Sequence, residues 1–248
     1  MEPRKERNVE FERLHNFRDL GGYRGADGRR VRWARLYRSD SLGKLSGRDA
    51  ERFAALGVRT VIDLRYPWEI EAGGRVPSGP GLAYFNFCVE HRPWDQASLS
   101  HELDPVRFVA DRYAEVASDG AEEIRQALQI IAAGDAPVVI HCASGKDRTG
   151  LVAALVLGLL GVADDDIAAD YALTELATER LRADWRASHP GRELVWPFYA
   201  RAPREVMDLA WAELIAKYGS VRDYVTGYLR QPARLIEQLR DIYLDEAG

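Results

Sequence analysis

The feature that most constrains the fold is an apolar segment, a polar loop of ten residues and a second apolar segment in direct succession. Residues 137–140 read Pro-Val-Val-Ile, which predicts a short buried strand. Residues 150–161 are apolar on all sides, which predicts a helix packed inside the core. The loop between them, residues 141–150, reads HCASGKDRTG. A strand that feeds a core helix through such a loop favours an α/β fold.

The rest of the chain alternates between strand and helix patterns. Strands are predicted at residues 31–37, 58–64 and 82–87, and helices at 46–57, from 105 onward and at 121–133. Residues 90–104 predict a long loop, and the C-terminal third predicts helices at 164–186, 203–218 and 232–244. We therefore expect a single domain over residues 1–248 with a small, mainly parallel sheet flanked by helices. Residues 1–30 would pack on this core, and residues 162–231 would form a helical elaboration of it.

Composition excludes several classes of protein. The formal net charge is −5, whereas a nucleic-acid-binding domain is usually basic. The charged N-terminus lacks the apolar run of a secretory signal, and the longest apolar stretch, residues 151–160, is too short to span a bilayer. The two cysteines, Cys88 and Cys142, form neither a disulfide framework nor a zinc motif. We expect a cytoplasmic protein with no metal, cofactor, nucleic-acid partner or transmembrane segment, although export without a cleavable signal stays open.

The loop has the residues of an anion site. Backbone N–H groups between a strand and a helix N-terminus can point inward and form an anion nest, to which the helix dipole adds positive charge. Arg148 can hold two phosphate oxygens with its planar guanidinium, and Lys146 supplies further positive charge. The predicted phosphate-binding residues are Ala143, Ser144, Gly145, Lys146, Arg148 and Thr149.

Cys142 stands at the start of this loop, where electropositive surroundings favour the thiolate over the thiol. A thiolate can attack phosphorus in line and form a phosphocysteine, which water then hydrolyses. Thr149 can donate a hydrogen bond to the departing sulfur. The residues therefore predict phosphate-ester hydrolysis through a covalent intermediate.

The leaving group of such a reaction needs a proton. Asp147 lies inside the loop, next to Arg148, and is the favoured general acid and base. Its rivals are Asp63, at the end of a predicted strand, and Asp95 and Asp104 on the long loop.

Three other residues receive supporting or structural roles. His141 is expected to orient the loop, and Asp63 to anchor the end of its strand. Cys88 is expected to be a small buried hydrophobic residue, with a protective disulfide to Cys142 as the alternative.

Taken together, these residues carry a family resemblance. HCASGKDRTG resembles the signature loop of the protein tyrosine phosphatase superfamily, and within it the atypical bacterial branch that includes mycobacterial tyrosine phosphatases and a Listeria lipid phosphatase. The resemblance extends to residues 16–23, 36–40, 61–65 with Glu69, and 218–220.

The resemblance implies a phosphatase fold with a central sheet of about four parallel strands and a helical lid. It also implies hydrolysis of phosphotyrosine, with phosphoserine, phosphothreonine and phosphoinositides as further substrates and no metal. Cys142 and Arg148 match the nucleophile and the phosphate-binding arginine, while Lys146 and Asp147 match the pair that marks the branch. The mobile tryptophan-proline-aspartate loop of eukaryotic relatives has no clean counterpart, since residues 93–95 read Pro-Trp-Asp.

The expected partners are a phosphorylated protein or a phosphoinositide, with phosphate or vanadate-like anions binding at the loop. Two alternatives remain at this stage. A phosphate-binding module without catalysis would keep Arg148 but has little need of Cys142 together with Asp147. A sulfurtransferase or an arsenate reductase also places a cysteine over an anion nest, but does not need the Asp147-Arg148-Thr149 sequence.

Overall fold

The computed structural model describes residues 7–134 and 137–246, so the first six residues of the expected N-terminal segment lie outside the described part. The strands are β1 (Arg18–Asp19), β2 (Leu36–Ser39), β3 (Thr60–Asp63), β4 (Ala83–Asn86) and β5 (Val138–His141). The helices are α1 (Gly47–Ala55), α2 (Pro67–Gly73), α3 (Pro105–Asp119), α4 (Ala121–Ala132), α5 (Asp147–Leu159), α6 (Asp164–Ala172), α7 (Thr178–Ser188), α8 (Arg204–Tyr218), α9 (Val221–Asp223) and α10 (Arg234–Tyr243).

The strands form one sheet in the order β1-β2-β5-β3-β4. The neighbouring strands β2, β5, β3 and β4 are parallel to one another, and β1 pairs with β2 as a short antiparallel edge strand. The predicted mainly parallel sheet is therefore confirmed. His141 pairs with Ser39 on one side and with Asp63 on the other, so three strands end in line where the loop begins. Ligand sites in α/β proteins lie at this carboxyl edge of the sheet.

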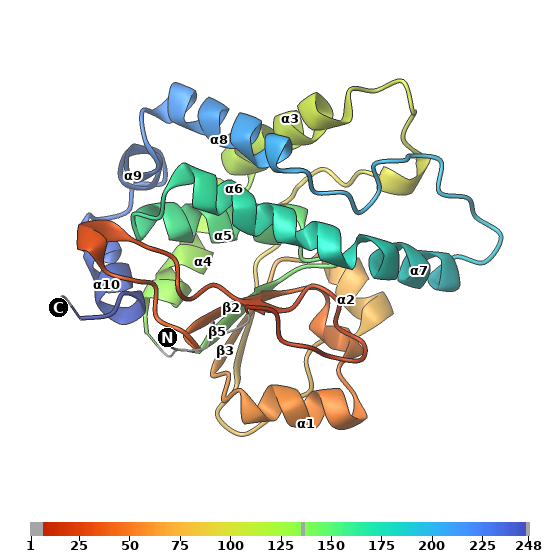
Figure 1. Cartoon of the computed structure of the whole chain (residues 1–248), viewed down its shortest axis with the longest axis horizontal. Helices are drawn as coiled ribbons and strands as arrows, with labels where there is room; N and C mark the ends of the chain where they lie inside the picture. The colour runs from red at the N-terminus through yellow and green to blue at the C-terminus, as the bar shows by residue number, and fades with distance from the viewer. Residues whose placement is uncertain (1–6, 135–136, 247–248) are drawn as a thin grey trace, which may run out of the picture.

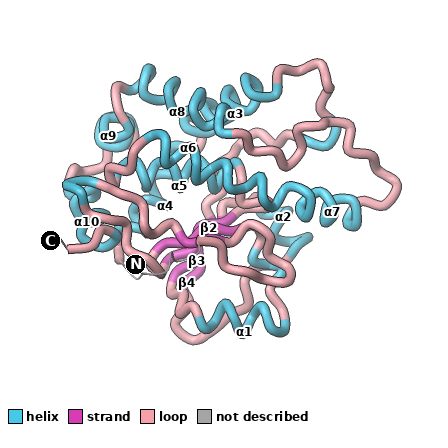
Figure 2. Tube along the Cα trace, in the orientation of Figure 1, coloured by secondary structure: helices cyan, strands magenta, loops and turns pink. Residues whose placement is uncertain are grey.

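Helices cover both faces of the sheet (Figure 1). Helix α1 lies on one face, α4 and α5 lie on the other, and α3, α6 and α8 form a further layer outside α5; the trace in Figure 2 shows the same layers. Val139 packs toward the α1 side, whereas Val138 and Ile140 pack toward the α5 side, as alternation along a strand requires. Helix α5 is thus enclosed by sheet and helices, which explains why its sequence is apolar all round.

Two predicted elements have the wrong boundaries. The strand expected at residues 31–37 begins only at Leu36, because Val31 pairs with Tyr23 and bridges to Leu244 outside the main strands. The helix expected at 164–186 is divided by a 3-10 turn at Leu173–Ala177. Within that turn the buried hydroxyl of Thr174 accepts hydrogen bonds from the N-terminal segment, so tertiary contacts end the α-helix there.

Helix α2 was not predicted. It follows β3 directly and begins with Pro67 at its first position, where proline is favoured. Its N-terminal capping box joins Tyr66 and Glu69, and this brings Glu69 toward the loop at residues 141–150. Among the described residues, no helix has both the length and the apolar character that crossing a bilayer requires.

Candidate active site

The loop after β5 turns its carbonyl groups outward. Three successive carbonyl oxygens accept hydrogen bonds from outside donors: Ala143 from the Ser41 N–H (3.1 Å), Ser144 from Nδ2 of Asn16 (2.9 Å) and Gly145 from Nη2 of Arg38 (2.7 Å). Because a trans peptide places each C=O opposite the next N–H, the N–H groups of residues 144–146 face the concave side. Within the described chain these N–H groups have no protein acceptor. Together with the start of α5 at Asp147, they form an anion nest.

Gly145 makes this curvature possible. Its φ is +67°, in the left-handed region that favours glycine. A Cβ atom at this position would lie 2.4 Å from the carbonyl oxygen of Ser39. No other residue fits without moving the loop away from β2.

Cys142 lies at the base of the nest with 1% of its surface exposed. Arg148 stands in the first turn of α5 and donates to both carboxylate oxygens of Glu69, at 2.5 and 3.0 Å. Burial alone would lower the pKa of Arg148, but the hydrogen bonds that it donates to Glu69, followed by its attraction to Cys142, raise that pKa above its ordinary value. The guanidinium is therefore a permanent positive charge in the first turn of α5, close to Cys142.

Asp147 is held by neighbours from two other elements. Its Oδ1 accepts from the hydroxyl of Tyr113 on α3 at 3.1 Å, and its Oδ2 accepts from Nε2 of Gln96 at 3.1 Å. The Tyr113 hydroxyl also lies 3.2 Å from that of Tyr171. Burial, and then the charge of Asp147, raise the pKa of both tyrosines well above 10, so Tyr113 stays protonated and can donate. A carboxyl fixed this way next to an anion nest can transfer a proton to a bound ester.

Gln96 is the residue that the sequence did not single out. Its amide donates to Asp147 and its carbonyl oxygen lies 3.5 Å from Nζ of Lys146, which is buried in the structure. Gln96 follows Asp95 directly, so the predicted long loop does reach the site, although by a different side chain. Gln96 lies in an irregular segment outside the HCASGKDRTG loop, and no pattern in the sequence identified it.

The rival carboxylates serve structural purposes. Asp95 caps a short 3-10 turn and pairs with Arg192 at 2.7 Å, and Asp104 caps α3. Asp63 accepts from Nε and Nη2 of Arg65, at 2.9 and 2.7 Å. Burial alone would raise the pKa of Asp63, but its hydrogen bonds with Arg65 outweigh this and lower it. Asp63 is therefore held as an ionised anchor.

His141 and Cys88 flank the site. Nε2 of His141 lies 3.5 Å from Oδ2 of Asp63, and its Nδ1 faces the carbonyl oxygen of Cys142 at 3.3 Å. Complete burial lowers the pKa of His141 to about 4, so the ring is neutral at physiological pH. Cys88 is only half-buried, and its thiol contacts the backbone oxygen of Glu90 at 3.4 Å. In the described residues no group of three His, Cys, Asp or Glu side chains is arranged to hold a metal.

A buried charge network supports the loop from behind. Asp170 on α6 accepts from Nη1 of Arg38 at 2.8 Å, from Nε of Arg18 at 3.2 Å and from the hydroxyl of Tyr23 at 3.1 Å. Arg18, Arg38 and Asp170 are each 1% exposed. Since Arg38 also holds the carbonyl of Gly145, Asp170 fixes the arginine that shapes the nest.

Replacing Asp170 should destabilise the fold strongly. Asp170→Asn leaves two buried guanidinium groups without a counter-charge, so we expect the free energy of unfolding to fall by about 3–5 kcal/mol. Urea denaturation measures this. Asp165→Asn on the same helix is the matched control: Asp165 is exposed and pairs with Arg204, and its loss should stay below about 1 kcal/mol. Equal losses in the two variants would contradict the role given to Asp170.

The difference in the free energy of unfolding between wild type and Asp170→Asn should depend on pH. Burial alone would raise the pKa of Asp170, but the charges of Arg18 and Arg38 lower it from 3.8 to about 2. A carboxyl with a lowered pKa contributes stability that is complete above its unfolded value and is lost as the pH falls through its folded value. The gap between wild type and Asp170→Asn should therefore be constant above about pH 4 and shrink between about pH 4 and 2.

Comparison with known proteins places this geometry in a family. A model of the tyrosine phosphatase family matches residues 9–245. A Cupriavidus necator protein whose name places it provisionally among the tyrosine-protein phosphatases is 33% identical, over 96% of this chain and 88% of its own. The triple specificity protein phosphatase PtpB of Mycobacterium tuberculosis is 30% identical over 68% and 69%, and a tyrosine-protein phosphatase of Nostoc commune is 32% identical over 85% and 74%. The chain belongs to the tyrosine phosphatase family.

Proposed function

We propose that Cys142 is the nucleophile of this phosphatase, that Arg148 and the loop N–H groups bind the phosphoryl oxygens, and that Asp147 is the general acid and base. The observation that carries the proposal is the row of N–H groups at residues 144–146, which have no acceptor among the described residues and lie between the buried Cys142 and the start of α5. Such a site stabilises the negative charge of the transferred phosphoryl group as the bond to its leaving oxygen breaks.

In the first step the sulfur of Cys142 forms a bond to phosphorus, the bond to the leaving oxygen breaks, and Asp147 gives that oxygen a proton. In the second step water attacks phosphorus, Asp147 takes the proton back, and the sulfur leaves as a thiolate. The Thr149 hydroxyl is buried and has no hydrogen-bond partner among the described residues, which supports its predicted bond to the departing sulfur.

Arg148 keeps donors for the substrate while it is fixed in place. A guanidinium has five N–H donors, and Glu69 occupies two of them. Nε of Arg148 lies 3.8 Å from Glu90, which is itself held by Arg112 at 3.0 Å. Glu69 thus fixes the orientation of the Arg148 guanidinium and leaves other N–H donors of that group for the substrate.

We infer that phosphotyrosine in proteins is the preferred substrate, with phosphoserine, phosphothreonine and phosphoinositides as weaker ones. The support lies in an aromatic pair beside Arg148. The Tyr66 ring lies 5.3 Å from the Arg148 guanidinium carbon, and Trp68 stacks on Tyr66 with ring centroids 5.4 Å apart. Trp68 is 57% exposed, so an aromatic face is open at the rim of a site whose cysteine lies deep. A phenyl phosphate reaches deeper than an alkyl phosphate and can stack at the rim.

Trp68→Ala tests this preference. We expect kcat/KM for a phosphotyrosine peptide to fall by about 3- to 10-fold, because one aromatic contact is worth about 0.5–1.5 kcal/mol. The same ratio for a matched phosphothreonine peptide, and for a short-chain phosphoinositide, should change by less than about twofold. Trp68→Phe is the control and should keep most of the wild-type value. Equal losses on all three substrates, or a wild-type enzyme that prefers phosphoinositide, would contradict the inferred specificity.

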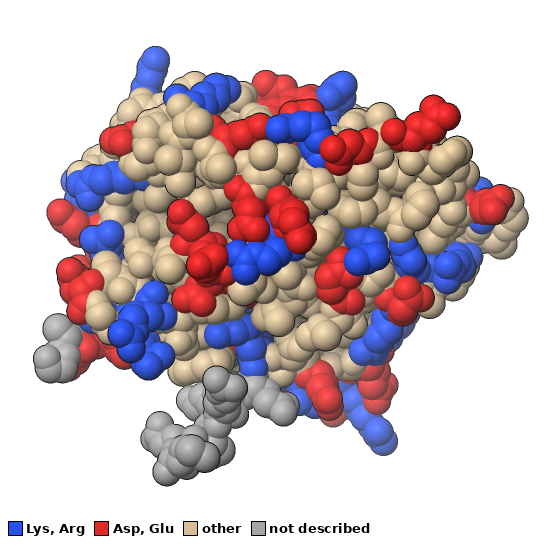
Figure 3. Space-filling model, turned by 45° about the horizontal axis from the view of Figure 1, so that its top comes forward, with Lys and Arg blue, Asp and Glu red and all other residues tan. Residues whose placement is uncertain are grey.

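The surface charge bears on the class of substrate, and the redox state of the two cysteines bears on the compartment. The face in Figure 3 shows Lys and Arg interleaved with Asp and Glu, which supports a compact anionic substrate rather than a nucleic acid. Cys88 and Cys142 are both free. We infer a reducing compartment such as the cytoplasm, because oxidation of the Cys142 thiolate would end activity.

A further inference from the structure

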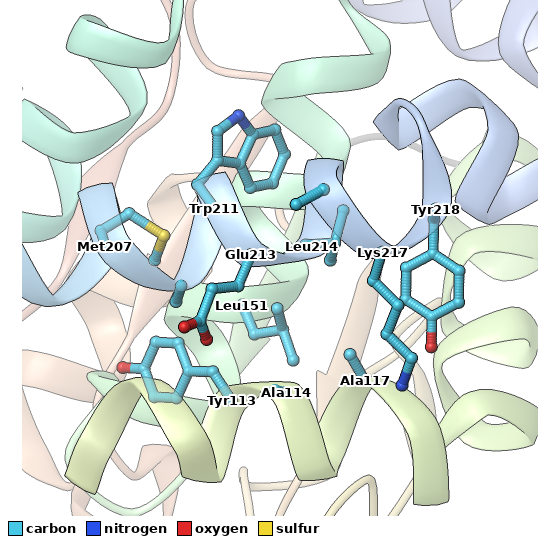
Figure 4. Close-up of a pocket in the computed structure, with 12 residues that line it drawn as sticks. Tyr113, Ala114, Ala117, Leu151, Met207, Trp211, Glu213, Leu214, Lys217 and Tyr218 are labelled. Atoms are coloured by element: carbon cyan, nitrogen blue, oxygen red, sulfur yellow. The ribbon is translucent and has the colours of Figure 1, made fainter. Parts of the chain in front are cut away.

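A cavity of about 410 Å³ lies between α3 and α8, and Tyr113, whose hydroxyl donates to Asp147, forms part of its wall (Figure 4). Its volume is in the range of about 300–1,000 Å³ that is typical of small-molecule sites. The walls are apolar: Ala114 and Ala117 come from α3, Leu151 from α5, and Met207, Trp211 and Leu214 from α8.

The two ends of this cavity differ in charge. Figure 4 shows Lys217 and Tyr218 at one end and Tyr113 and Glu213 nearer the other. Glu213 is compensated by Arg107, which donates to both of its oxygens at 2.5 and 2.7 Å. The Lys217 ammonium donates to the hydroxyl of Ser118 at 3.0 Å and lies 5.0 Å from the centre of the Tyr218 ring, but no carboxylate of the described residues forms an ion pair with it. The exposed end therefore has an uncompensated positive charge beside an apolar interior.

We propose that this cavity binds a free single-chain fatty carboxylate. The alkyl chain lies along the apolar walls, where burial of each CH₂ group is favourable by about 0.8 kcal/mol, and the carboxylate meets the Lys217 ammonium. The charge complementarity selects an anionic head over a neutral one. The inference goes beyond the phosphatase reaction and does not depend on it.

The position of the cavity connects it to the catalytic loop. Tyr113 forms part of its wall while its hydroxyl donates to Asp147, and Leu151 of the wall lies one turn after Asp147 on α5. A bound chain therefore lies against the side chain that holds the proposed general acid.

Isothermal titration calorimetry of the full chain with dodecanoate, kept below its micelle concentration, tests the proposal. We expect saturable binding at one site, with a negative heat-capacity change because apolar surface is buried. Ala114→Leu fills the cavity from a half-buried position and should weaken binding at least tenfold. Ala169→Leu, on the exposed face of α6, is the matched control and should leave the affinity unchanged.

The contribution of the Lys217 charge is tested by replacing Lys217, which is exposed, so the substitution should not disturb the fold. Lys217→Gln should weaken dodecanoate about three- to fivefold and leave the affinity for dodecanol unchanged. Arg222→Gln, which changes an exposed cation outside the cavity, should have no effect on either ligand. Absence of saturable dodecanoate binding, an Ala114→Leu variant with wild-type affinity, or equal loss of both ligands in Lys217→Gln would each overturn the proposal.

Discussion

Cys142→Ser should reduce turnover of para-nitrophenyl phosphate by at least about 10⁴-fold, the scale on which removal of a covalent nucleophile acts. Serine has nearly the same shape, so the buried position and the outward hydrogen bonds of the loop carbonyls should persist. Its hydroxyl, however, stays protonated at neutral pH and cannot replace a thiolate. The N–H groups and Arg148 are untouched, so the variant should still bind inorganic phosphate.

Steady-state rates and calorimetry with phosphate measure the two properties separately. Cys88→Ser is the matched control, because Cys88 is the other free cysteine and its thiol donates to the backbone carbonyl of Glu90, a bond that serine can also make. It should keep its activity within about twofold. Turnover that survives in Cys142→Ser would exclude the phosphocysteine mechanism. Loss of phosphate binding in that variant would instead mean that the loop depends on the sulfur for its shape.

The central unit could be predicted because its determinants are local. The apolar strand at Val138–His141, the glycine at 145 and the apolar helix that follows specify a strand, a tight loop and a buried helix within about 20 residues. The hydrophobic pattern fixes the two elements, and the left-handed φ of Gly145 fixes the turn between them. Cys142, Asp147 and Arg148 could be chosen as candidates for the same reason, since all three lie within seven positions of one short loop.

The outer supports of the loop could not be predicted, because they come from distant segments. Arg38 reaches Gly145 across 107 positions of sequence, and Asn16 reaches Ser144 across 128. Their partners depend on which strands become neighbours, and a sequence pattern does not give that. The antiparallel edge strand β1 was missed for the same reason: two residues show no periodicity, and its pairing with β2 is a tertiary contact.

In the loop at residues 90–104, the sequence could not predict which of two adjacent side chains faces the site. Residues 93–95 have the residue types of a known acid loop, and the sequence placed Asp95 among the rival acids. In the structure Asp95 turns away to Arg192, and Gln96, one position later, contacts Asp147. A shift of one residue in an irregular segment exchanges an inward side chain for an outward one. Its direction is set by packing, including the bond from Val195 N–H to the Ala97 carbonyl.

Asp147→Asn should reduce kcat by about 10²- to 10⁴-fold for substrates with poor leaving groups, such as phenyl phosphate or a phosphotyrosine peptide. Asparagine keeps the size of the side chain but cannot give up a proton to the leaving oxygen. For 2,4-dinitrophenyl phosphate, whose leaving group needs no proton, formation of the phosphocysteine should be nearly as fast as in wild type. A pre-steady-state burst measures that step.

Asp95→Asn is the control, because Asp95 is the exposed rival carboxylate and is occupied by Arg192. It should leave both substrates within about twofold of wild type. If the two leaving groups are slowed equally by Asp147→Asn, its carboxylate acts through the position of the loop rather than as an acid. The proton donor would then have to be sought among the groups around Asp147, of which Tyr113 is the nearest with a hydroxyl proton to give.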